Sequence, residues 1–444
     1  MSSLSVEYAR AGKNVNRVVS IGGRQFKTAL CSPETSRGSA CSDWMTSYLR
    51  GNPSKFLGDE ISKEPLGLVD LFSGCGGFSL GAALAAQALG LTIEPLLAVD
   101  IDPVALDVYS RNLKPESVLT SSVNTLVDYQ LWSDDGRTTF ARQPRISASM
   151  LSFVGRTSIV IGGPPCQGHS GFNNHTRGKD DRNQLYLTVP AIGIALKAPI
   201  IIVENVYNVL NDKFKVVQHA TELFESNGYS VASIKLLASS YGVAQTRKRH
   251  FLVASKFGCA KTTGAFDAFR TEPFTTGQAI LDLADLEGAS AFDRAARLSE
   301  KNVQRIKHLF DNNSYKLPNE VRPDCHKDGH TYPSVYGRLS SDGLANTVTT
   351  GFASPGRGRY VHPTKERALT AHEAARLQGF PDSFSFSSSS GRELTSKAYG
   401  KLIGDAVPPP LGFIPVMAAL LTHPDFNTNQ QSQAVGHIAE AQAA

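Results

Sequence analysis

The 444-residue sequence lacks most features of exported, membrane-bound or metal-stabilised proteins. Its longest apolar runs, such as residues 198–203, are far shorter than the roughly 20 residues that cross a bilayer. No charged-then-apolar leader opens the chain, so we expect neither export nor membrane association. The six cysteines are scattered without a CxxC pair or a Cys/His cluster, which argues against a zinc module and a disulfide framework. These absences predict a cytoplasmic protein with reduced thiols and no metal.

Strong overall charge is also lacking, because 45 basic and 40 acidic side chains leave a net charge of only +5. Residues 294–367 nevertheless hold 13 Lys and Arg against 7 Asp and Glu, a surplus of +6. The rest of the chain is therefore close to neutral. On charge alone, a solvated basic face and a surface that contacts phosphate explain this segment equally well.

An ordered pattern occupies residues 65–423, whereas residues 1–64 predict a flexible extension and residues 424–444 a polar tail. Short apolar runs alternate with helical patterns, at residues 68–72, 95–99, 158–161, 199–203, 231–237 and 250–254. This alternation predicts an α/β fold with a mostly parallel sheet, whose ligands bind beyond the carboxyl ends of the strands. The rhythm fails over residues 258–345, which predicts a second, smaller domain.

The first apolar run leads into a glycine-rich turn, FSGCGG at residues 72–77, and then into an Ala/Leu-rich helix. Glycines at such a helix N-terminus let backbone amides approach a ligand closely. Ser79 stands where the GxGxxG fingerprint needs glycine, which disfavours pyrophosphate binding. Asp100 and Ile101 end the second run, where a carboxylate can accept hydrogen bonds from ribose and Ile101 can cover adenine. Together they indicate an adenosyl ligand; for the glycines alone, a tight structural turn is the alternative.

The third apolar run is followed by GGPPCQGHS at residues 162–170. Pro164 and Pro165 stiffen the backbone and remove two amide donors, which favours a rigid loop that presents Cys166. A thiolate is a strong nucleophile when nearby cations or helix dipoles lower the thiol pKa from about 8.5. An isolated cysteine is usually buried and inert, but the rigid polar loop favours the nucleophile.

Two further polar patterns adjoin strands. Glu204 comes directly after the apolar residues 200–203 and is a candidate acid or base, with a capping or salt-bridging glutamate as the alternative. In the sequence QTRKRHF, Gln245, Arg247 and Arg249 alternate and are expected to share one face of an extended chain. Two guanidinium groups there could bind phosphate or a base oxygen, although a plain surface run of basic residues is the alternative.

In this order, FSGCGG, GGPPCQGHS, ENV, QTRKRHF, RALTAHEAARLQGFPD and GDAVPPPL resemble the motifs of bacterial cytosine-C5 DNA methyltransferases. The resemblance covers residues 65–423 and implies a Rossmann-like methyltransferase sheet. It implies a catalytic domain at 65–257, a target-recognition domain inserted at 258–366, and a C-terminal part at 367–423 that completes the catalytic domain. The implied reaction is methylation of C5 of a flipped-out cytosine in double-stranded DNA by S-adenosylmethionine.

The resemblance also implies roles for individual side chains. Cys166 would attack C6 of the cytosine, and Glu204 would hold or protonate N3. Arg249 would contact O2, with support from Arg247 and Gln245. The residues implied for cofactor binding are Phe72, Gly74, Gly76, Gly77, Asp100, Ile101, Pro164, Asp405, Ala406 and Val407. The residues implied for DNA binding are Gln167, Ser170, Gln245, Thr347, Arg357 and Arg359.

Four positions depart from the family pattern: His169 replaces a common Phe, Asp405 an Asn, His372 an Arg, and Ser122 an expected acidic residue. Departures of this kind predict altered affinity or base-flipping geometry more than inactivity. As a hypothesis, His169 makes a polar contact where an aromatic ring normally packs.

Three other functions compete with DNA methylation. A tRNA cytosine-C5 methyltransferase would usually carry a Cys-Phe-Thr tripeptide, which is absent here. A thiol hydrolase would need an oriented histidine and no adenosyl site. A catalytically inactive DNA-binding regulator is disfavoured by Cys166, Glu204 and Arg249. We expect a cytoplasmic, nucleoid-associated monomer; in a restriction-modification system a cognate restriction endonuclease would accompany it, while a solitary enzyme would act alone.

Overall fold

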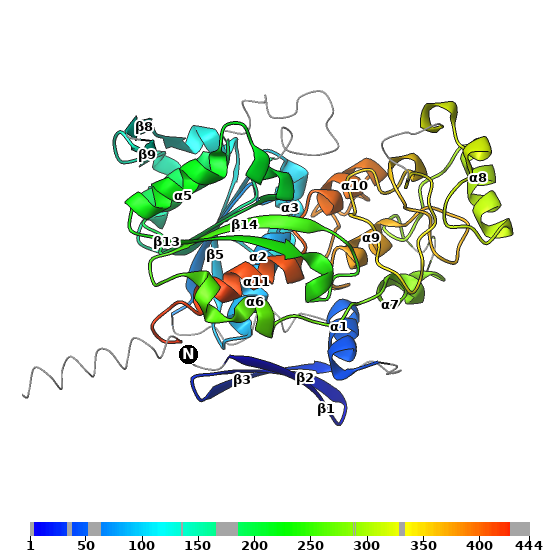
Figure 1. Ribbon diagram of the computed structural model, residues 1–444, viewed down its shortest axis with the longest axis horizontal. Coiled ribbons are helices and arrows are strands. Elements are labelled where there is room, and N and C mark those ends of the chain that lie inside the picture. The colour runs from blue at the N-terminus through cyan, green and yellow to red at the C-terminus, as the bar shows by residue number, and fades with distance from the viewer. Residues whose placement is uncertain are drawn as a thin grey trace, which may run out of the picture.

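The computed structural model describes residues 4–32, 38–51, 64–134, 136–165, 185–286, 288, 290–327 and 334–426. A central sheet flanked by helices forms one side of the molecule, and a region of short helices and irregular segments forms the other (Figure 1). A small separate sheet built from the first strands lies below the central sheet in the same view.

The central sheet has seven strands in the order β13-β14-β12-β11-β4-β5-β6. Their bounds are β4 Leu66–Leu71, β5 Ile93–Asp100, β6 Ser117–Thr120, β11 Thr157–Gly162, β12 Ile200–Val206, β13 Ser230–Leu237 and β14 Lys248–Ser255. The pairs among β12, β11, β4, β5 and β6 are parallel, and β14 is antiparallel to both β12 and β13. The predicted α/β fold with a mostly parallel sheet is confirmed, and each of the six apolar runs forms a strand.

Both faces of this sheet are covered by helices, which explains why its strands are almost continuously apolar. Ile200 and Ile202 join the core with α2 and α11, whereas Ile201 and Val203 join the core with α4 and α5. The helix bounds are α2 Gly77–Gln87, α3 Pro103–Leu113, α4 Leu185–Ala195, α5 Val216–Ser226 and α11 Pro409–Leu420. The chain thus returns at its C-terminal end to pack α11 against α2, the first helix of the sheet.

One helical stretch, Ser396–Leu420, is long and apolar enough to cross a membrane by length and composition alone. It is 83% buried within the structure, where its second half is the core helix α11. Its apolar character is therefore explained by packing inside the protein.

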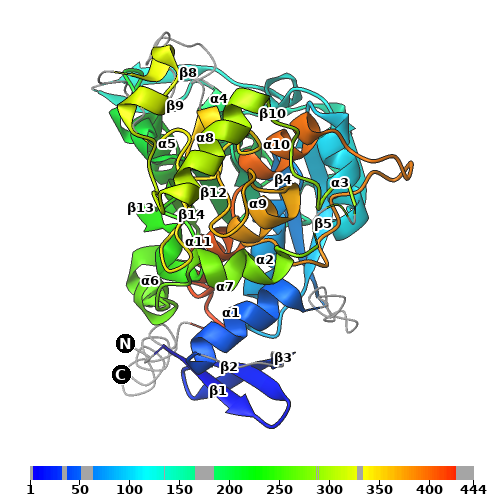
Figure 2. The same ribbon diagram turned by 90° about the vertical axis from the view of Figure 1, so that its right-hand side faces the viewer.

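The prediction of a flexible extension over residues 1–64 is wrong for the described part. Strands β1 Ser5–Ala11, β2 Asn14–Ile21 and β3 Arg24–Cys31 form an antiparallel sheet, and α1 Ala40–Arg50 lies between that sheet and α7 (Figure 2). The alternation of apolar and polar residues that marks a strand is hard to recognise in β2, because a charged residue, Arg17, occupies its buried face. Its guanidinium is accommodated 4.8 Å from the ring centre of Trp44 and 5.1 Å from that of Phe413.

The region after β14 contains α6 Ala265–Ala268, α7 Thr276–Ile280 and α8 Glu300–Asp311, and within its described residues strand pairing is limited to isolated bridges. It has a small core of its own, made by Ile306, Leu309, Leu317, Val335, Tyr336 and Val361. The second domain and its limits at residues 258 and 366 stay a prediction. Helices α9 Ala371–Leu377 and α10 Ser396–Gly404 lie between it and the sheet (Figure 1).

Two small two-stranded sheets lie beside α4 and α5. Their strands are β7 Val127–Asp128, β8 Leu131–Asp134, β9 Arg137–Phe140 and β10 Arg145–Ile146.

Candidate active site

A cavity of about 350 Å³ lies at the carboxyl ends of the parallel strands, where ligands bind in open α/β sheets. It gathers predicted residues that lie far apart in the sequence. The predicted residues that line it are Phe72, Gly74, Gly77, Asp100, Ile101, Pro164, Glu204, Arg247, Arg249, Asp405, Ala406 and Val407. One cavity therefore brings together the predicted cofactor contacts and the predicted acid and guanidinium groups.

The turn between β4 and α2 forms one end of this cavity. Asp100 accepts hydrogen bonds from the backbone amides of Gly74 and Asp102, both at 2.9 Å, so the carboxylate is held at the end of β5. Phe72 has a left-handed backbone with a φ of 59°, a strained conformation that is typical of functional turns. Ile101 is 71% exposed, an apolar side chain that a bound ring could cover.

Two of the glycines in this turn are required by close packing. A Cβ at Gly77 would lie 2.3 Å from the carbonyl oxygen of Val407. Gly76 has a φ of 96°, and a Cβ there would lie 2.5 Å from the Leu113 side chain. Gly76 does not line the cavity, so its role in the structure is to allow this turn to pack against Leu113.

Asp70 is a cavity residue that we did not predict. It lies in β4, is 1% exposed, and accepts a hydrogen bond of 2.6 Å from Ser79 Oγ, which also contacts the Tyr109 hydroxyl at 2.8 Å. Burial raises the pKa of Asp70 to about 8. Ser79 is therefore needed as the partner of Asp70 at the position where a dinucleotide fingerprint has glycine. The sequence signal that could have identified Asp70 is an acidic residue inside the apolar run 68–72.

Lys401 and Asp405 from the end of α10 also face the cavity. Lys401 Nζ lies 2.8 Å from Asp102 Oδ2, and burial raises the pKa of Asp405 although Lys401 and Arg247 oppose the shift. The glycine-turn end of the cavity is thus lined by the carboxyl groups of Asp70, Asp100 and Asp405.

Glu204 and Arg249 form the second group in the cavity. Arg249 Nε is 2.8 Å from Glu204 Oε1, because antiparallel β14 places Arg249 opposite Val206 at the end of β12. The contact is an ion pair, and within the described part of the chain Oε1 has no hydrogen-bond partner of good geometry. Burial raises the pKa of Glu204, although Arg249 and Arg247 counteract it. A buried carboxyl with free hydrogen-bonding capacity is suited to exchange a proton with a ligand.

Cys166, Gln167, His169 and Ser170 lie outside the described residues, so their predicted roles stay predictions. Pro164 and Pro165, which directly precede Cys166 in the sequence, line the cavity. Asn205 Nδ2 donates to the Pro164 carbonyl oxygen at 3.2 Å. The ENV sequence therefore contributes two functions, an acid that faces the cavity and an amide that holds the proline segment.

Arg247 supports the site from within the protein. Its guanidinium is buried and donates to the carbonyl oxygens of Val348 at 3.0 Å and Ala406 at 3.1 Å. It therefore ties the segment before Tyr360 to the segment after α10, while its predicted role in support of Arg249 stays a prediction.

The prediction that Gln245 contacts DNA is wrong. Gln245 is 0% exposed, and its amide nitrogen donates to Leu377 O and Gln378 Oε1 while its oxygen accepts from Val348 N. Arg247 and Arg249 both line the cavity as expected, whereas Gln245 does not, because these contacts hold its side chain inside the protein.

The other predicted DNA contacts lie outside the cavity lining. Arg357 is exposed, Arg359 is partly buried with an Nε that has no hydrogen-bond partner, and Thr347 accepts the Tyr360 hydroxyl proton on its carbonyl oxygen at 2.9 Å. Ser122 is not a lining residue either; its hydroxyl donates to Asn124. Among the residues that the structure describes, no group of three or more His, Cys, Asp or Glu is arranged to hold a metal ion.

Comparisons with known proteins show which family the chain belongs to. The model of the C-5 cytosine-specific DNA methylase family matches residues 66–416. The type II methyltransferase M1.BsuMI of Bacillus subtilis (strain 168) is 38% identical over 80% of this chain and 80% of its own length. The type II methylase M.HgiDII of Herpetosiphon aurantiacus is 30% identical over 78% of this chain and 92% of its own length.

A solved structure supports the fold alone. It is that of a prophage-encoded E. coli protein described as a DNA modification methyltransferase, with a TM-score of 0.53 and 24% identity. The match covers 80% of this chain and 98% of that one.

Proposed function

Since this chain belongs to the C-5 cytosine-specific DNA methylases, we propose that it uses S-adenosylmethionine to methylate C5 of a cytosine within a specific sequence of double-stranded DNA. One observation carries the proposal: the Glu204–Arg249 pair, the Asp100 turn and the prolines before Cys166 share a single cavity. DNA is the substrate of the family, and the methyl donor and the individual residue roles are the parts proposed here.

The described residues fit an adenosyl cofactor with a positive charge. Phe72, Asp100 and Ile101 would hold the adenosyl group, while Asp405, Ala406 and Val407 would close the cavity from the other side. The carboxylate oxygens of Asp100 and Asp405 at this end suit a cation, and they suit a pyrophosphate poorly. When bound, S-adenosylmethionine supplies an electrophilic methyl group.

The side chains of this protein would activate the cytosine. The Cys166 thiolate forms a bond to C6 while Glu204 donates a proton to N3, so that the electron pair of the C5–C6 bond makes C5 nucleophilic. Burial raises the pKa of Glu204, which favours a protonated carboxyl that can serve as this donor. Arg249 would bind O2 and stabilise the charge that develops there.

After C5 has accepted the methyl group, loss of the C5 proton to a base restores the C5–C6 double bond. The same step breaks the bond between sulfur and C6 and releases Cys166 as a thiolate. N3 returns its proton to Glu204, so the nucleophile and the acid are both regenerated, and 5-methylcytosine is the product.

The test uses purified protein, labelled S-adenosylmethionine, duplex DNA and tRNA. We expect label in DNA with the wild type, none with Cys166→Ala, and wild-type transfer with the control Cys31→Ala, which removes an exposed cysteine of the N-terminal sheet. Label in tRNA alone would favour the RNA enzyme. Equal transfer by Cys166→Ala would overturn the mechanism, and no transfer to either substrate would favour an inactive regulator.

Bisulfite sequencing of DNA from an expressing host would identify the target sequence. Because the two relatives are named type II enzymes, we further propose a restriction-modification role with a cognate endonuclease, for a monomeric cytoplasmic protein. Protection of host DNA from an endonuclease encoded beside it would support that role, and gel filtration tests the monomer.

A further inference from the structure

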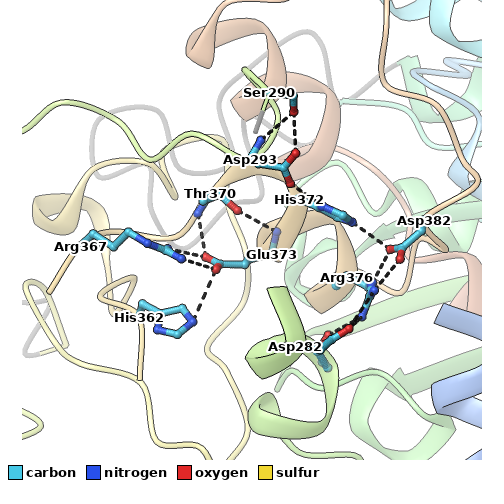
Figure 3. A network of polar contacts seen from close by, with 11 residues as sticks. Asp282, Ser290, Asp293, His362, Arg367, Thr370, His372, Glu373, Arg376 and Asp382 are labelled. Carbon is cyan, nitrogen blue, oxygen red and sulfur yellow. Dashed lines mark hydrogen bonds and ion pairs between the residues drawn. The ribbon is translucent and has the colours of Figure 1, made fainter. Parts of the chain in front are cut away.

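His372 forms a bridge between two carboxylates that come from different parts of the chain (Figure 3). Its Nδ1 is 2.8 Å from Asp293 Oδ1, and its Nε2 is 2.9 Å from Asp382 Oδ1. Asp293 lies between α7 and α8, inside the predicted recognition domain, and Asp382 follows α9. The ring thus joins the segment before α8 to α9, the helix that leads back into the catalytic domain.

The same segment is also held by contacts that do not titrate. The His372 amide donates to the Phe292 carbonyl oxygen at 3.0 Å, and the Phe292 ring stacks on the His372 ring at 4.9 Å with an interplanar angle of 24°. Phe292 also contacts Phe386 and Tyr399, and Ser290 Oγ donates to Asp293 Oδ2 at 2.6 Å. Loss of the polar bridge would therefore loosen this segment without unfolding it.

Only the charged form of His372 can make both contacts. A neutral imidazole has one N–H and one lone pair, so one ring nitrogen would direct its lone pair at a carboxylate oxygen. Burial opposes the charged ring, but the hydrogen bonds to Asp382 and Asp293 outweigh it and raise the pKa of His372. The geometry and the charge balance both identify the bound form as an imidazolium.

The surrounding charges make the bridge conditional on that proton. Arg376 binds Asp382 through Nη2 at 2.5 Å and opposes the positive charge on His372, while Asp282 lies 3.4 Å from Arg376 and 3.1 Å from Arg50. Asp382 therefore keeps a cationic partner when His372 loses its proton, whereas the side-chain contacts that Asp293 keeps among the described residues are those with Ser290.

We propose that His372 is a pH-dependent positioning residue, which in its protonated form ties the segment before α8 in the predicted recognition domain to α9 and thereby aligns that domain with the cavity. In its neutral form one of the two carboxylates loses its donor, and the bridge opens. The consequence for DNA rests on the proposed function, whereas the bridge itself does not.

The direction of the pH effect follows from the raised pKa. A group whose pKa is higher in the folded protein than its ordinary value of about 6.5 stabilises fully below that value. The contribution is lost as the pH rises through the folded-state pKa. We therefore expect docking of residues 290–298 to weaken in the alkaline range.

Hydrogen–deuterium exchange without DNA or cofactor tests the bridge directly. After correction for intrinsic exchange, protection of peptides covering residues 290–298 should fall about ten-fold between pH 6.5 and 9 in the wild type, the effect of one charged hydrogen bond. His372→Gln should show the low protection at both pH values. The matched control His219→Gln, which removes a histidine 3.7 Å from Glu222 on α5, should behave as the wild type. Equal wild-type protection at both pH values would overturn the proposal.

Methylation kinetics test the consequence for DNA. The ratio of the KM for duplex DNA of His372→Gln to that of the wild type should be about ten at pH 6.5 and close to one at pH 9, because the wild type then also lacks the bridge. In Asp293→Asn the amide can accept a hydrogen bond from the protonated His372 ring or donate one to the neutral ring. The KM of this variant for duplex DNA should therefore change less with pH than that of the wild type. A pH-independent ratio would remove the link to DNA, and a failure of the proposed methylation would leave the exchange result intact.

Discussion

Two buried glutamates, one in the catalytic cavity and one beneath the recognition region, are held in opposite ways. Glu204 has one ion-pair partner, Arg249, and an Oε1 without a hydrogen bond. Glu373 is fully buried and accepts from Arg367 Nη1 at 2.9 Å, Arg367 Nη2 at 2.7 Å and the Thr370 amide at 2.9 Å. A satisfied buried carboxylate stabilises a fold, whereas an unsatisfied one that faces a cavity retains capacity for a ligand.

The neighbouring histidines sharpen this contrast. His362 Nε2 lies 3.5 Å from Glu373, within ion-pair distance, but burial lowers the pKa of His362 to about 4. His362 is therefore neutral at pH 7 and leaves the charge balance of Glu373 to Arg367. His372, by contrast, meets two carboxylates and carries a charge. Around α9 the polar groups bind one another and hold the surrounding segments together. In the cavity, Glu204 keeps hydrogen-bonding capacity that a substrate could use.

The largest expected effect is on catalysis, from Glu204→Gln. The amide keeps the shape of the side chain but cannot transfer a proton, so kcat should fall by about 10²–10⁴. The melting temperature should fall less than in Glu373→Gln, because Arg249 loses its carboxylate but lines the cavity, where water can reach it. Label transfer and thermal melting measure the two quantities. Wild-type kcat in this variant would show that Glu204 is structural.

The converse change, Glu373→Gln, should act on stability. It leaves Arg367 buried without its carboxylate, which should lower the free energy of unfolding by about 3–5 kcal/mol. Chemical denaturation measures the loss, and Arg367→Met combined with Glu373→Gln should recover part of it. If kcat of the folded variant fell as strongly as in Glu204→Gln, the contrast between the two glutamates would be wrong.

Asp70→Asn should change the pH dependence of stability by a smaller amount, about 1–3 kcal/mol. The pKa of Asp70 is raised to about 8, so the folded protein binds the proton more tightly than the unfolded chain does. The wild type should therefore lose stability as the pH rises from about 4 to 8, and the variant should lose less. Denaturation at pH 5 and pH 8.5 measures the free energy of unfolding of both proteins. An equal change between the two pH values in the wild type and the variant would contradict the raised pKa of Asp70.

The smallest effect is expected from Asp405→Asn, which removes one of three carboxyl groups around the proposed cofactor. The KM for S-adenosylmethionine should rise about three-fold, the size of one weak charge contact. Since burial raises the pKa of Asp405, this difference should vanish as the pH falls and the wild-type carboxyl group becomes protonated. An unchanged KM at alkaline pH would place the cofactor's charge elsewhere.

Local pattern predicted much of the catalytic domain. Runs such as residues 200–203 are apolar on both faces, and Asp100 and Glu204 stand at the strand ends where ligands bind. These features depend on neighbours in sequence, because a strand buried on both sides must be apolar throughout. The same reasoning failed for β2, where aromatic rings from α1 and α11 bury Arg17.

By itself, the sequence determined the strands, the glycine turn at residues 72–77 and the chemistry at each strand end, because these follow from periodicity and backbone preference. Only the tertiary structure decided which distant groups meet. Antiparallel β14 carries Arg249 to Glu204, Gln245 is buried against the end of α9, and His372 reaches an aspartate 79 positions earlier. A local pattern shows which side chains need a partner, but the partner often lies far away in the sequence and is brought close by the order and direction of the strands and helices.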